Sequence, residues 1–242
     1  MQFINLAGYK FVALDGLPEL KSALTSRCRA LGLKGTILVS PEGINIFVAG
    51  TAEASSQFKA LIRDDPRLAD LHFKESLSDY PPYSRMLVKI KKEIITLRVP
   101  GVDPAAQRAP TIAPAELKRW LDEGKDLVLL DTRNAFEVET GTFRNAVHLN
   151  LKSFGDFPGA ADRLLPEFRD KTIVTFCTGG IRCEKAAPVL VDKGFREVYQ
   201  LDGGILQYFE DCGDAHFDGR CFVFDQRNAL DGRLQPEIAD ER

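Results

Sequence analysis

TIVTFCTGGIRCEK, residues 172–185, is the stretch that decides the fold of the second half of the chain. Its residues 173–176 are apolar or β-branched and predict a buried strand. A tight loop with two adjacent glycines begins at Cys177, and residues 184–187 then start a helix. This order of strand, cysteine, glycine-bearing loop and helix predicts a ligand site at the carboxyl edge of an open α/β sheet.

Cys177 is the candidate catalytic residue of this site. Adjacent glycines let the backbone adopt positive φ angles and turn its N–H groups toward one point. The helix that begins after the loop adds unpaired N–H donors and the positive end of its dipole. Because these groups stabilise an anion, the pattern predicts a lowered pKa for Cys177 and a thiolate as its reactive form. The chemistry is then that of nucleophilic sulfur, as a thiolate, a persulfide or a covalent adduct.

The alternative is a purely structural role, in which this cysteine is a small buried hydrophobic residue, as most cysteines after apolar strands are. The position of Cys177 at a strand end, in one turn with two glycines and an arginine, favours the functional interpretation. The predicted anion- or substrate-binding loop consists of Thr178, Gly179, Gly180, Ile181, Arg182 and Cys183. Cys183 is either a resolving thiol or an inward-facing residue of the first helical turn, since C-x5-C is neither the C-x-x-C redox motif nor a usual zinc spacing.

The remainder of residues 111–212 alternates strand and helix patterns, which predicts a doubly wound parallel sheet. The continuous apolar run at 127–130 is expected of a parallel strand that is covered on both faces. A brief helix is predicted over residues 164–168, and residues 222–224 are expected to form a strand that caps the core.

Three charged residues follow the strand at 127–130, at the same predicted sheet edge as the cysteine. We predict that Asp131, Arg133 and Glu137 support the loop. Arg133 either binds a substrate phosphate or pairs with Glu137 at (i, i+4) to brace the loop. We favour bracing for this residue, and Arg182 for contact with the substrate or an anion.

Residues 1–98 predict a smaller domain of the α+β class. Strand and helix patterns follow one another as β-α-β-β-α-β with an extra strand, which is typical of ferredoxin-like or acylphosphatase-like domains. The predicted strands span residues 3–14, 35–39, 44–48, 71–76 and 86–97, and the helices begin at Leu17 and Ala52. Ser40 to Gly43 reads as a hairpin turn between the second and third strands.

Basic residues gather on or beside the last of these strands, namely Arg85, Lys89, Lys91, Lys92 and Arg98. A sheet of this type leaves one face free of helices, and a basic face suits RNA. The same lysines also protect an edge strand from aggregation, and composition alone favours that interpretation. Residues 1–110 hold 15 Lys and Arg against 11 Asp and Glu, whereas the whole chain has a net charge of −3. This basic first half is compatible with a polyanionic partner.

Residues 99–110, with three prolines and no apolar periodicity, are the predicted linker, and residues 213–242 the predicted C-terminal extension. The chain of 242 residues is 44% hydrophobic and 28% charged, as expected of a globular protein in solution. Its start shows no signal peptide, and no apolar run approaches the roughly 20 residues that span a membrane. Five scattered cysteines do not form a disulfide framework. These features predict a cytoplasmic protein.

Four separate blocks carry a resemblance to a known family: GTILVSPEGINIFVAG at 35–50, RMLVKIKKEIITL at 85–97, CTGGIRCEKA at 177–186 and GRCFVFDQR at 219–227. With DTR at 131–133, Glu137 and LDGG at 201–204, residues 111–212 resemble a rhodanese domain, in whose active-site loop backbone amides surround a cysteine persulfide. Nearly the whole chain resembles the bacterial rhodanese-domain tRNA uridine hydroxylases.

This resemblance implies oxygen-dependent formation of 5-hydroxyuridine at the wobble position of tRNA. It implies that Cys177 is essential and that molecular oxygen is the co-substrate. It also implies that the amino-terminal domain helps to hold the tRNA. The candidate contacts are Arg85, Lys89, Lys91 and Lys92, with Glu42 and Asn45 facing the same cleft.

The chain departs from the family pattern in two places. The family's EGIN block often continues with Gly-Thr, whereas Ile46-Phe47 follow here. Many members also carry a cysteine-rich tail, but Cys221 is the only cysteine after Cys212. Any role of that tail is therefore expected to be absent or to come from another chain.

Two other functions stay open. A persulfide sulfurtransferase would use the same cysteine loop. A non-catalytic RNA-binding or regulatory module would carry out neither hydroxylation nor sulfur transfer. No cofactor is evident, because the sequence lacks a flavin fingerprint, a facial metal triad and a haem motif. His72, His148 and His216 share no ligand spacing, so no metal site is expected. The sequence identifies no protein partner.

Overall fold

The structure is a computed structural model that describes residues 2–164 and 166–236. The chain divides into two compact units, Met1–Thr96 and Leu97–Arg242, which are described one at a time. The domain boundaries after residues 98, 110 and 212 stay predictions. Met1, Leu165 and the last six residues of the predicted extension, 237–242, lie outside the described residues.

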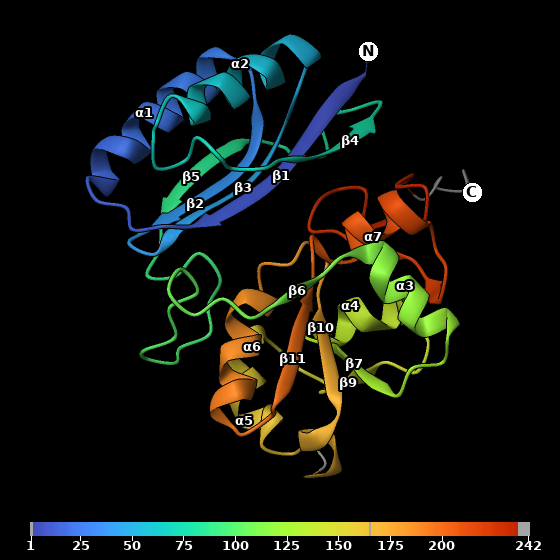
Figure 1. Cartoon of the computed structure of the whole chain (residues 1–242). Coiled ribbons are helices and arrows are strands. Elements are labelled where there is room, and N and C mark those ends of the chain that lie inside the picture. The colour runs from blue at the N-terminus through green and yellow to red at the C-terminus, as the bar shows by residue number, and fades with distance from the viewer. Residues whose placement is uncertain (1, 165, 237–242) are drawn as a thin grey trace. The chain divides into compact units, whose positions relative to one another are not determined.

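The first unit is one five-stranded sheet with two helices on one face (Figure 1). Its elements are β1 (Phe3–Phe11), α1 (Leu17–Ala30), β2 (Lys34–Ser40), β3 (Gly43–Gly50), α2 (Ala52–Arg63), β4 (Lys74–Ser78) and β5 (Met86–Ile90). The strand order is β4-β1-β3-β2-β5, antiparallel except that β5 runs parallel to β2. The predicted ferredoxin- or acylphosphatase-like arrangement, with its extra strand, is confirmed.

The core of this unit follows from strand alternation. Ile37 and Val39 of β2 and Ile44 and Ile46 of β3 all point to the face that the helices cover, and all are fully buried. Phe58 of α2 packs into the same cluster. The turn between β2 and β3 contains only Pro41 and Glu42, since Ser40 pairs with Gly43, as the hairpin pattern predicts.

The predicted last strand is too long. The strand β5 ends at Ile90, and the N–H of Lys91 donates the final ladder bond to Val39 O at 2.9 Å. The chain then turns, so that Ile94 is buried, with its N–H donating to Glu42 Oε1 at 2.7 Å. The apolar residues of this segment belong to an irregular turn into the core, which alternation along a sequence does not distinguish from a strand. The predicted strand at 71–76 also begins too early. A turn precedes it, and β4 begins at residue 74.

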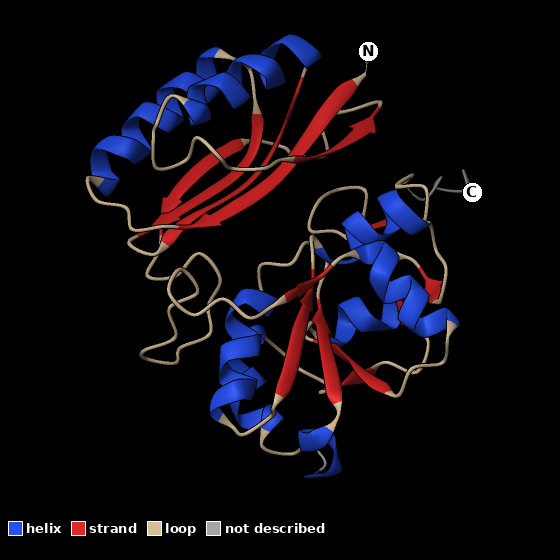
Figure 2. Ribbon diagram, in the orientation of Figure 1, coloured by secondary structure: helices blue, strands red, loops and turns tan. Residues whose placement is uncertain are grey.

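The second unit is built on a five-stranded parallel sheet of order β6-β11-β10-β7-β9 (Figure 2). Its main strands and helices are β6 (Thr111–Ile112), α3 (Pro114–Asp122), β7 (Leu127–Asp131), α4 (Ala135–Thr140), β9 (Val147–His148), α5 (Phe157–Ala161), β10 (Thr172–Phe176), α6 (Cys183–Asp192), β11 (Glu197–Leu201) and α7 (Gly204–Cys212). Helices lie on both faces of this sheet (Figure 1). The predicted doubly wound parallel sheet is confirmed.

The central strand β10 is buried along its whole length. Val174 and Phe176 pack in one cluster with Leu117 of α3 and Tyr208 of α7. The alternate residues of the strand point to the opposite face, which α6 covers. A strand that is covered on both faces needs the continuous apolar run that the sequence shows.

Two predictions for the second unit need correction. In place of one helix at 164–168 the chain forms α5 earlier and a 3-10 helix, η2 (Pro166–Asp170), and residue 165 lies outside the described residues. The predicted strand 222–224 is shorter, because β13 (Cys221–Phe222) pairs with β14 (Ala229–Leu230) only at these two positions. The N–H of Val223 then donates to Asn228 O at 2.8 Å, which closes a turn and leaves Phe224 exposed.

The segment after α7 folds back onto the second unit. Its strand β12 (Phe217–Gly219) pairs antiparallel with β8 (Gly141–Phe143). Phe217 and Cys221 are buried in the cluster that also holds β10 and α7. Residues 213–236 therefore complete the core of this unit.

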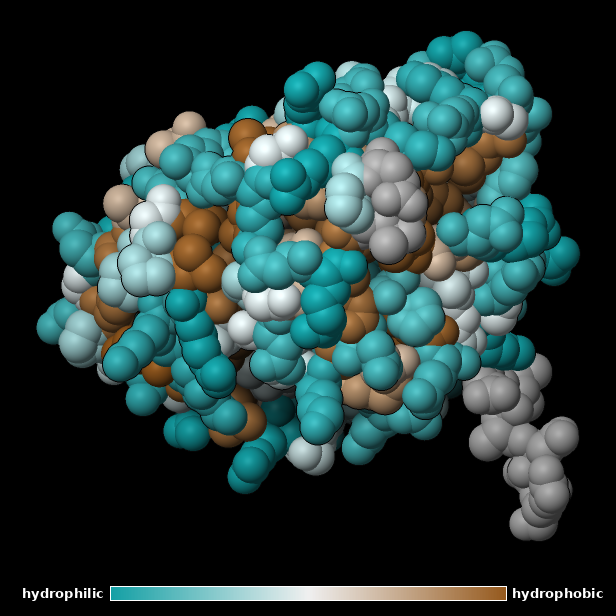
Figure 3. Space-filling model, turned by 90° about the horizontal axis from the view of Figure 1, so that it is seen from below, coloured by the Kyte–Doolittle hydropathy of each residue, from teal (hydrophilic) through white to brown (hydrophobic). Residues whose placement is uncertain are grey.

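The face seen in Figure 3 carries mostly hydrophilic side chains, with hydrophobic patches between them. Within residues 2–164 and 166–236, no helix combines the length and the apolar character needed to cross a membrane.

Replacing the buried aromatic ring of α2 tests the core of the first unit. Phe58 is fully buried, with its ring centroid 6.0 Å from that of Phe73, so Phe58→Ala leaves a cavity. We expect a loss of about 3–5 kcal/mol in the free energy of unfolding, measured by urea denaturation. The matched control Leu77→Ala removes a side chain that is 49% exposed and is expected to cost about 0.5 kcal/mol or less. Equal losses in the two variants would contradict this packing.

Candidate functional site

The carboxyl ends of β7 and β10 define the site, because Asp131 and Phe176 pair at the last position of their ladder. Thr132, the next residue after β7, donates both its N–H and its Oγ1 hydroxyl to Phe176 O, at 3.0 and 2.9 Å. Cys177 follows Phe176 directly. The structure therefore places Cys177 at the sheet edge where parallel α/β folds bind ligands.

The Cys177 sulfur is fully buried and lies inside its own loop. The N–H of Gly180 donates to Cys177 Sγ at 3.1 Å. Burial alone would raise the pKa of this thiol. The Cys183 thiol, the charge of Arg182 and the backbone N–H groups of Arg182 and Gly180 outweigh burial and lower the pKa of Cys177 to about 5. The sulfur is therefore a thiolate at neutral pH.

The N-terminus of α7 holds the loop from behind. The N–H groups of Ile205 and Leu206 donate to the carbonyls of Cys177 and Thr178, at 2.9 and 3.0 Å. Gly204 allows this approach, because it has φ +66° and a Cβ at its position would lie 2.4 Å from Cys177 O. With these two carbonyls bound to α7, the N–H of Gly180 is left to donate to the sulfur.

Arg182 and Glu137 form a buried ion pair beside the loop. Arg182 Nη1 and Nη2 donate to the two carboxylate oxygens of Glu137 at 2.6 and 2.7 Å, and both side chains are almost completely buried. The N–H of Asn134 donates to Glu137 Oε1 at 3.0 Å. Burial acts to lower the pKa of Arg182, but Glu137 and the Cys177 thiolate raise it, so Arg182 stays charged. Its contact with a substrate stays a prediction, since in the structure its charge acts on Cys177 through space.

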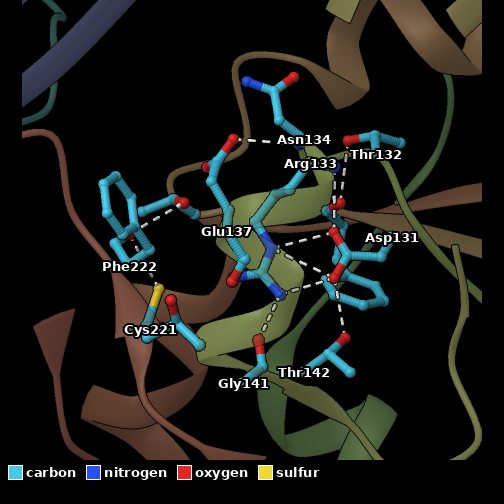
Figure 4. A network of polar contacts seen from close by, with 12 residues as sticks. Asp131, Thr132, Arg133, Asn134, Glu137, Gly141, Thr142, Cys221 and Phe222 are labelled. Carbon is cyan, nitrogen blue, oxygen red and sulfur yellow. Dashed lines mark hydrogen bonds and ion pairs between the residues drawn. The ribbon is translucent and has the colours of Figure 1, made fainter. Parts of the chain in front are cut away.

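Arg133 and Asp131 form a second buried pair, shown in Figure 4. Arg133 Nε and Nη2 donate to the Asp131 carboxylate, and Nη2 also donates to Gly141 O at 2.6 Å. The Thr142 hydroxyl donates to Asp131 Oδ2 at 2.8 Å. The expected pairing of Arg133 with the Glu137 carboxylate is wrong. That carboxylate bonds to Arg182, and Arg133 reaches only the Glu137 backbone carbonyl, at 3.4 Å.

Cys183 is the first residue of α6 and is fully buried. Its sulfur lies 3.8 Å from Thr132 Oγ1. Burial, and then the hydrogen bond and negative charge of Cys177, raise the pKa of Cys183 well above its ordinary value. Cys183 is thus a thiol that stabilises the neighbouring thiolate, while a resolving role stays a prediction.

The other loop residues differ in their surroundings. The Thr178 hydroxyl donates to Phe222 O at 3.4 Å, which ties the loop to β13. A Cβ at Gly179 would meet nothing within 4 Å, so that position is open. Ile181 is buried. Their predicted contacts with an anion or a substrate stay predictions.

The six candidate tRNA contacts lie in the first unit and stay predictions, whereas Arg98, at the end of the same basic stretch, belongs to the second unit. The side chains of Arg85, Lys89, Lys91 and Lys92 are all exposed, on or beside the edge strand β5. Glu42 and Asn45 have a structural task, because both bond to the backbone of Ile94 and hold the turn that follows β5.

Sequence reasoning missed two contributors to the site. Gly204 supports the loop backbone and is the last residue of the LDGG block at 201–204. A glycine at the start of a helix is the sequence signal that could have identified it. Cys221 is fully buried, and burial raises its pKa to about 12, with the charge of Arg133 acting in the opposite direction. Its position near the arginine pairs has no sequence signal. In the described part of the chain, no three His, Cys, Asp or Glu side chains gather as metal ligands would.

Comparison with known proteins gives the family. The model of the UPF0176 acylphosphatase like domain matches residues 3–94, and that of the rhodanese-like domain matches residues 113–211. A tRNA uridine(34) hydroxylase of Cupriavidus taiwanensis is 54% identical over 98% of this chain and 86% of its own. The chain belongs to the tRNA uridine(34) hydroxylase family. A tRNA uridine(34) hydroxylase of Ralstonia nicotianae is 53% identical over the same shares of the two chains.

Among solved structures, the rhodanese-like domain of an Anabaena protein is 19% identical, with a TM-score of 0.40 over 55% of this chain and 89% of its own. The two domain matches of the hydroxylase family member coincide with the acylphosphatase-like sheet and with the rhodanese sheet that carries Cys177.

The ionisation of Cys177 in this hydroxylase family member is open to direct titration. Because its pKa is lowered to about 5, the thiolate absorbance in the ultraviolet should rise with its midpoint near pH 5 and be almost complete at pH 7. The difference between the wild-type and Cys177→Ser proteins isolates this signal. Cys212→Ser is the control and should leave the transition in place. A transition near the ordinary value of 9.0 would contradict the geometry.

Two glycine substitutions test whether α7 positions the Cys177 loop. Gly204→Ala places a methyl group against Cys177 O in a strained backbone conformation, whereas Gly179→Ala places one in open space. We expect Gly204→Ala to raise the pKa of Cys177 and to lower turnover on tRNA roughly 100-fold, because displacing the loop by about 1 Å misplaces the sulfur. Gly179→Ala should leave the pKa unchanged. The same pKa in both variants would show that α7 does not position the loop.

Proposed function

We propose that this protein hydroxylates uridine 34 of tRNA at the 5-position, with the Cys177 thiolate as the reacting group and molecular oxygen as the co-substrate. The observation that carries the proposal is a buried cysteine at the carboxyl edge of the rhodanese sheet, whose sulfur accepts a hydrogen bond from the Gly180 N–H at 3.1 Å and whose pKa is lowered by its surroundings. Relatives that match 98% of this chain, and share about half of its residues, bear the name tRNA uridine(34) hydroxylase. We place the reaction in the cytoplasm.

The chemistry uses the sulfur as a nucleophile. Attack of a thiolate on C6 of uracil forms a C–S bond and makes C5 electron-rich, so that C5 reacts with an electrophilic oxygen species. One oxygen atom bonds to C5. The other leaves as water, formed with two electrons from an external reductant and two protons from solvent. Loss of the C5 proton then restores the C5–C6 double bond and expels the thiolate. In this scheme Cys177 begins and ends as a thiolate, the form that the loop N–H groups and Arg182 stabilise.

The first unit supplies the proposed contact with tRNA. Its edge strand β5 and the adjoining residues expose four cations, at positions 85, 89, 91 and 92. Such cations bind phosphates without reading the base sequence, so they would position the tRNA while the second unit selects the uridine.

A sulfurtransferase that passes persulfide sulfur from Cys177 to an acceptor remains the second candidate, because its loop would also need N–H groups around the sulfur. The two functions differ in the bond that forms at the acceptor, and no contact in the site favours the sulfurtransferase over the hydroxylase. A non-catalytic module would not require the lowered pKa of Cys177.

Nucleoside mass spectrometry of tRNA tests the proposal. Cells that lack the protein should lose 5-hydroxyuridine and its derivatives. Wild type and the matched control Cys212→Ser should restore them, and Cys177→Ser should reduce them at least about 100-fold, because no other group replaces the nucleophile.

A different nucleoside pattern would contradict the proposal. If 5-hydroxyuridine persists and a thiolated nucleoside falls, the protein is a sulfurtransferase. If Cys177→Ser restores the nucleosides as well as wild type does, the thiolate is not the reacting group. Purified protein with unmodified tRNA and oxygen then separates redundancy in the cell from inactivity.

A further inference from the structure

Three phenylalanines form a partly exposed cluster beside the Cys177 loop, which we call the aromatic trio: Phe136, Phe222 and Phe224. The ring centroids lie 5.2 Å apart for Phe136–Phe222 and for Phe222–Phe224, and 6.2 Å apart for Phe136–Phe224. All three pairs are edge-to-face, with interplanar angles of 82–89°. Phe136 is 45% exposed and Phe224 is 58% exposed.

Burial does not explain this cluster. A phenylalanine stabilises a fold mainly by the area it removes from water, and Phe224 keeps more than half of its side chain in water. Edge-to-face contacts stabilise this arrangement of the rings, and Phe136 and Phe224 keep much of their surface accessible. A cluster of exposed apolar side chains is a common feature of binding surfaces.

The trio is joined to the reactive loop from two sides. Thr178, the residue after the reactive cysteine, donates its hydroxyl to the backbone carbonyl of Phe222. Phe136 directly precedes Glu137, which holds Arg182. Figure 4 shows Phe222 on the side of Glu137 away from Asp131, next to Cys221. The backbone of the trio is therefore attached to two residues, Thr178 and Glu137, that belong to the Cys177 site.

We propose that the aromatic trio stacks on an unpaired base of the tRNA anticodon loop and so presents the target uridine to the Cys177 loop. The choice of this RNA rests on the proposed function. Proteins that bind single-stranded RNA stack its unpaired bases on aromatic side chains, because every base offers a π-face once it leaves a helix. Phenylalanine has no polar group for base-edge contacts, so the trio selects unpaired bases of any sequence, and a paired base cannot reach it.

Substitutions at Phe224 test the stacking, because this residue is the most exposed of the three. The experiment measures the dissociation constant of the full chain for an anticodon stem-loop RNA with uridine at position 34, and kcat/KM on whole tRNA. Phe224→Ala and Phe224→Leu should weaken binding roughly 5- to 100-fold, because both remove the ring face. Phe224→Trp keeps a ring face and should bind as tightly as wild type. Val191→Ala, at an apolar residue of the same unit that is 52% exposed, is the matched control and should change nothing.

Abasic RNAs identify the stacked base. An abasic site is placed at position 34 or at either neighbour. When the stacked base is missing, Phe224→Ala should cause no further loss of affinity, because the two changes remove the same contact. If Phe224→Ala weakens every abasic RNA as much as the intact one, the trio does not stack on the loop bases.

The remaining outcomes separate this proposal from the proposed function. Wild-type affinity of Phe224→Ala and Phe224→Leu overturns the stacking and leaves the hydroxylase proposal intact. Weak binding by all the Phe224 variants, the tryptophan included, together with a lowered melting temperature, shows a structural role and also overturns it. If wild type forms no 5-hydroxyuridine but the ring-dependent affinity is found, the stacking surface stands and the hydroxylase proposal fails.

Discussion

A negative charge on a fully buried sulfur atom is the constraint on which the second unit depends. Such a charge is costly unless hydrogen bonds and an opposite charge replace the water that it loses. Gly180 and Arg182 supply these to Cys177. The N–H groups of Ile205 and Leu206, at the start of α7, bind the carbonyls of Cys177 and Thr178 and so hold the first part of the loop in place. Gly204 is the residue that lets α7 approach closely enough.

The stabilising cation itself needs a partner. An unpaired buried arginine would cost about 3–5 kcal/mol, and the bidentate contact with Glu137 removes that cost. Glu137 is placed by α4, and the second buried pair, Arg133 with Asp131, fixes the backbone on either side of that helix through Gly141 O. The two buried ion pairs thus tie α4 to the residues on either side of it, β7 and β8.

The segment after α7 completes this arrangement. Phe217 and Cys221 fill the core of the second unit, and the turn after β13 leaves Phe224 at the surface near the loop. In the first unit, Glu42 and Asn45 use their side chains to hold the chain after β5, so the exposed cations of that edge are carried on a fixed backbone. Each unit thus combines a well-packed core with one edge whose side chains are suited to a ligand.

The sequence by itself determined the two sheet folds, the hairpin at Pro41-Glu42 and the position of Cys177 at a strand end. These depend on local signals, namely the period of apolar residues, the glycine pair and the order of strands and helices. It did not determine where the strand after residue 86 ends, because apolar residues in an irregular turn alternate as they do in a strand. Only the tertiary structure decided that Arg133 pairs with Asp131 and Arg182 with Glu137, since Arg182 lies 45 residues from its partner. It likewise decided that Gly204 supports the loop and that Phe136 meets Phe222 and Phe224. Contacts between residues far apart in the sequence depend on how the helices and strands pack together, and local sequence patterns do not predict that packing.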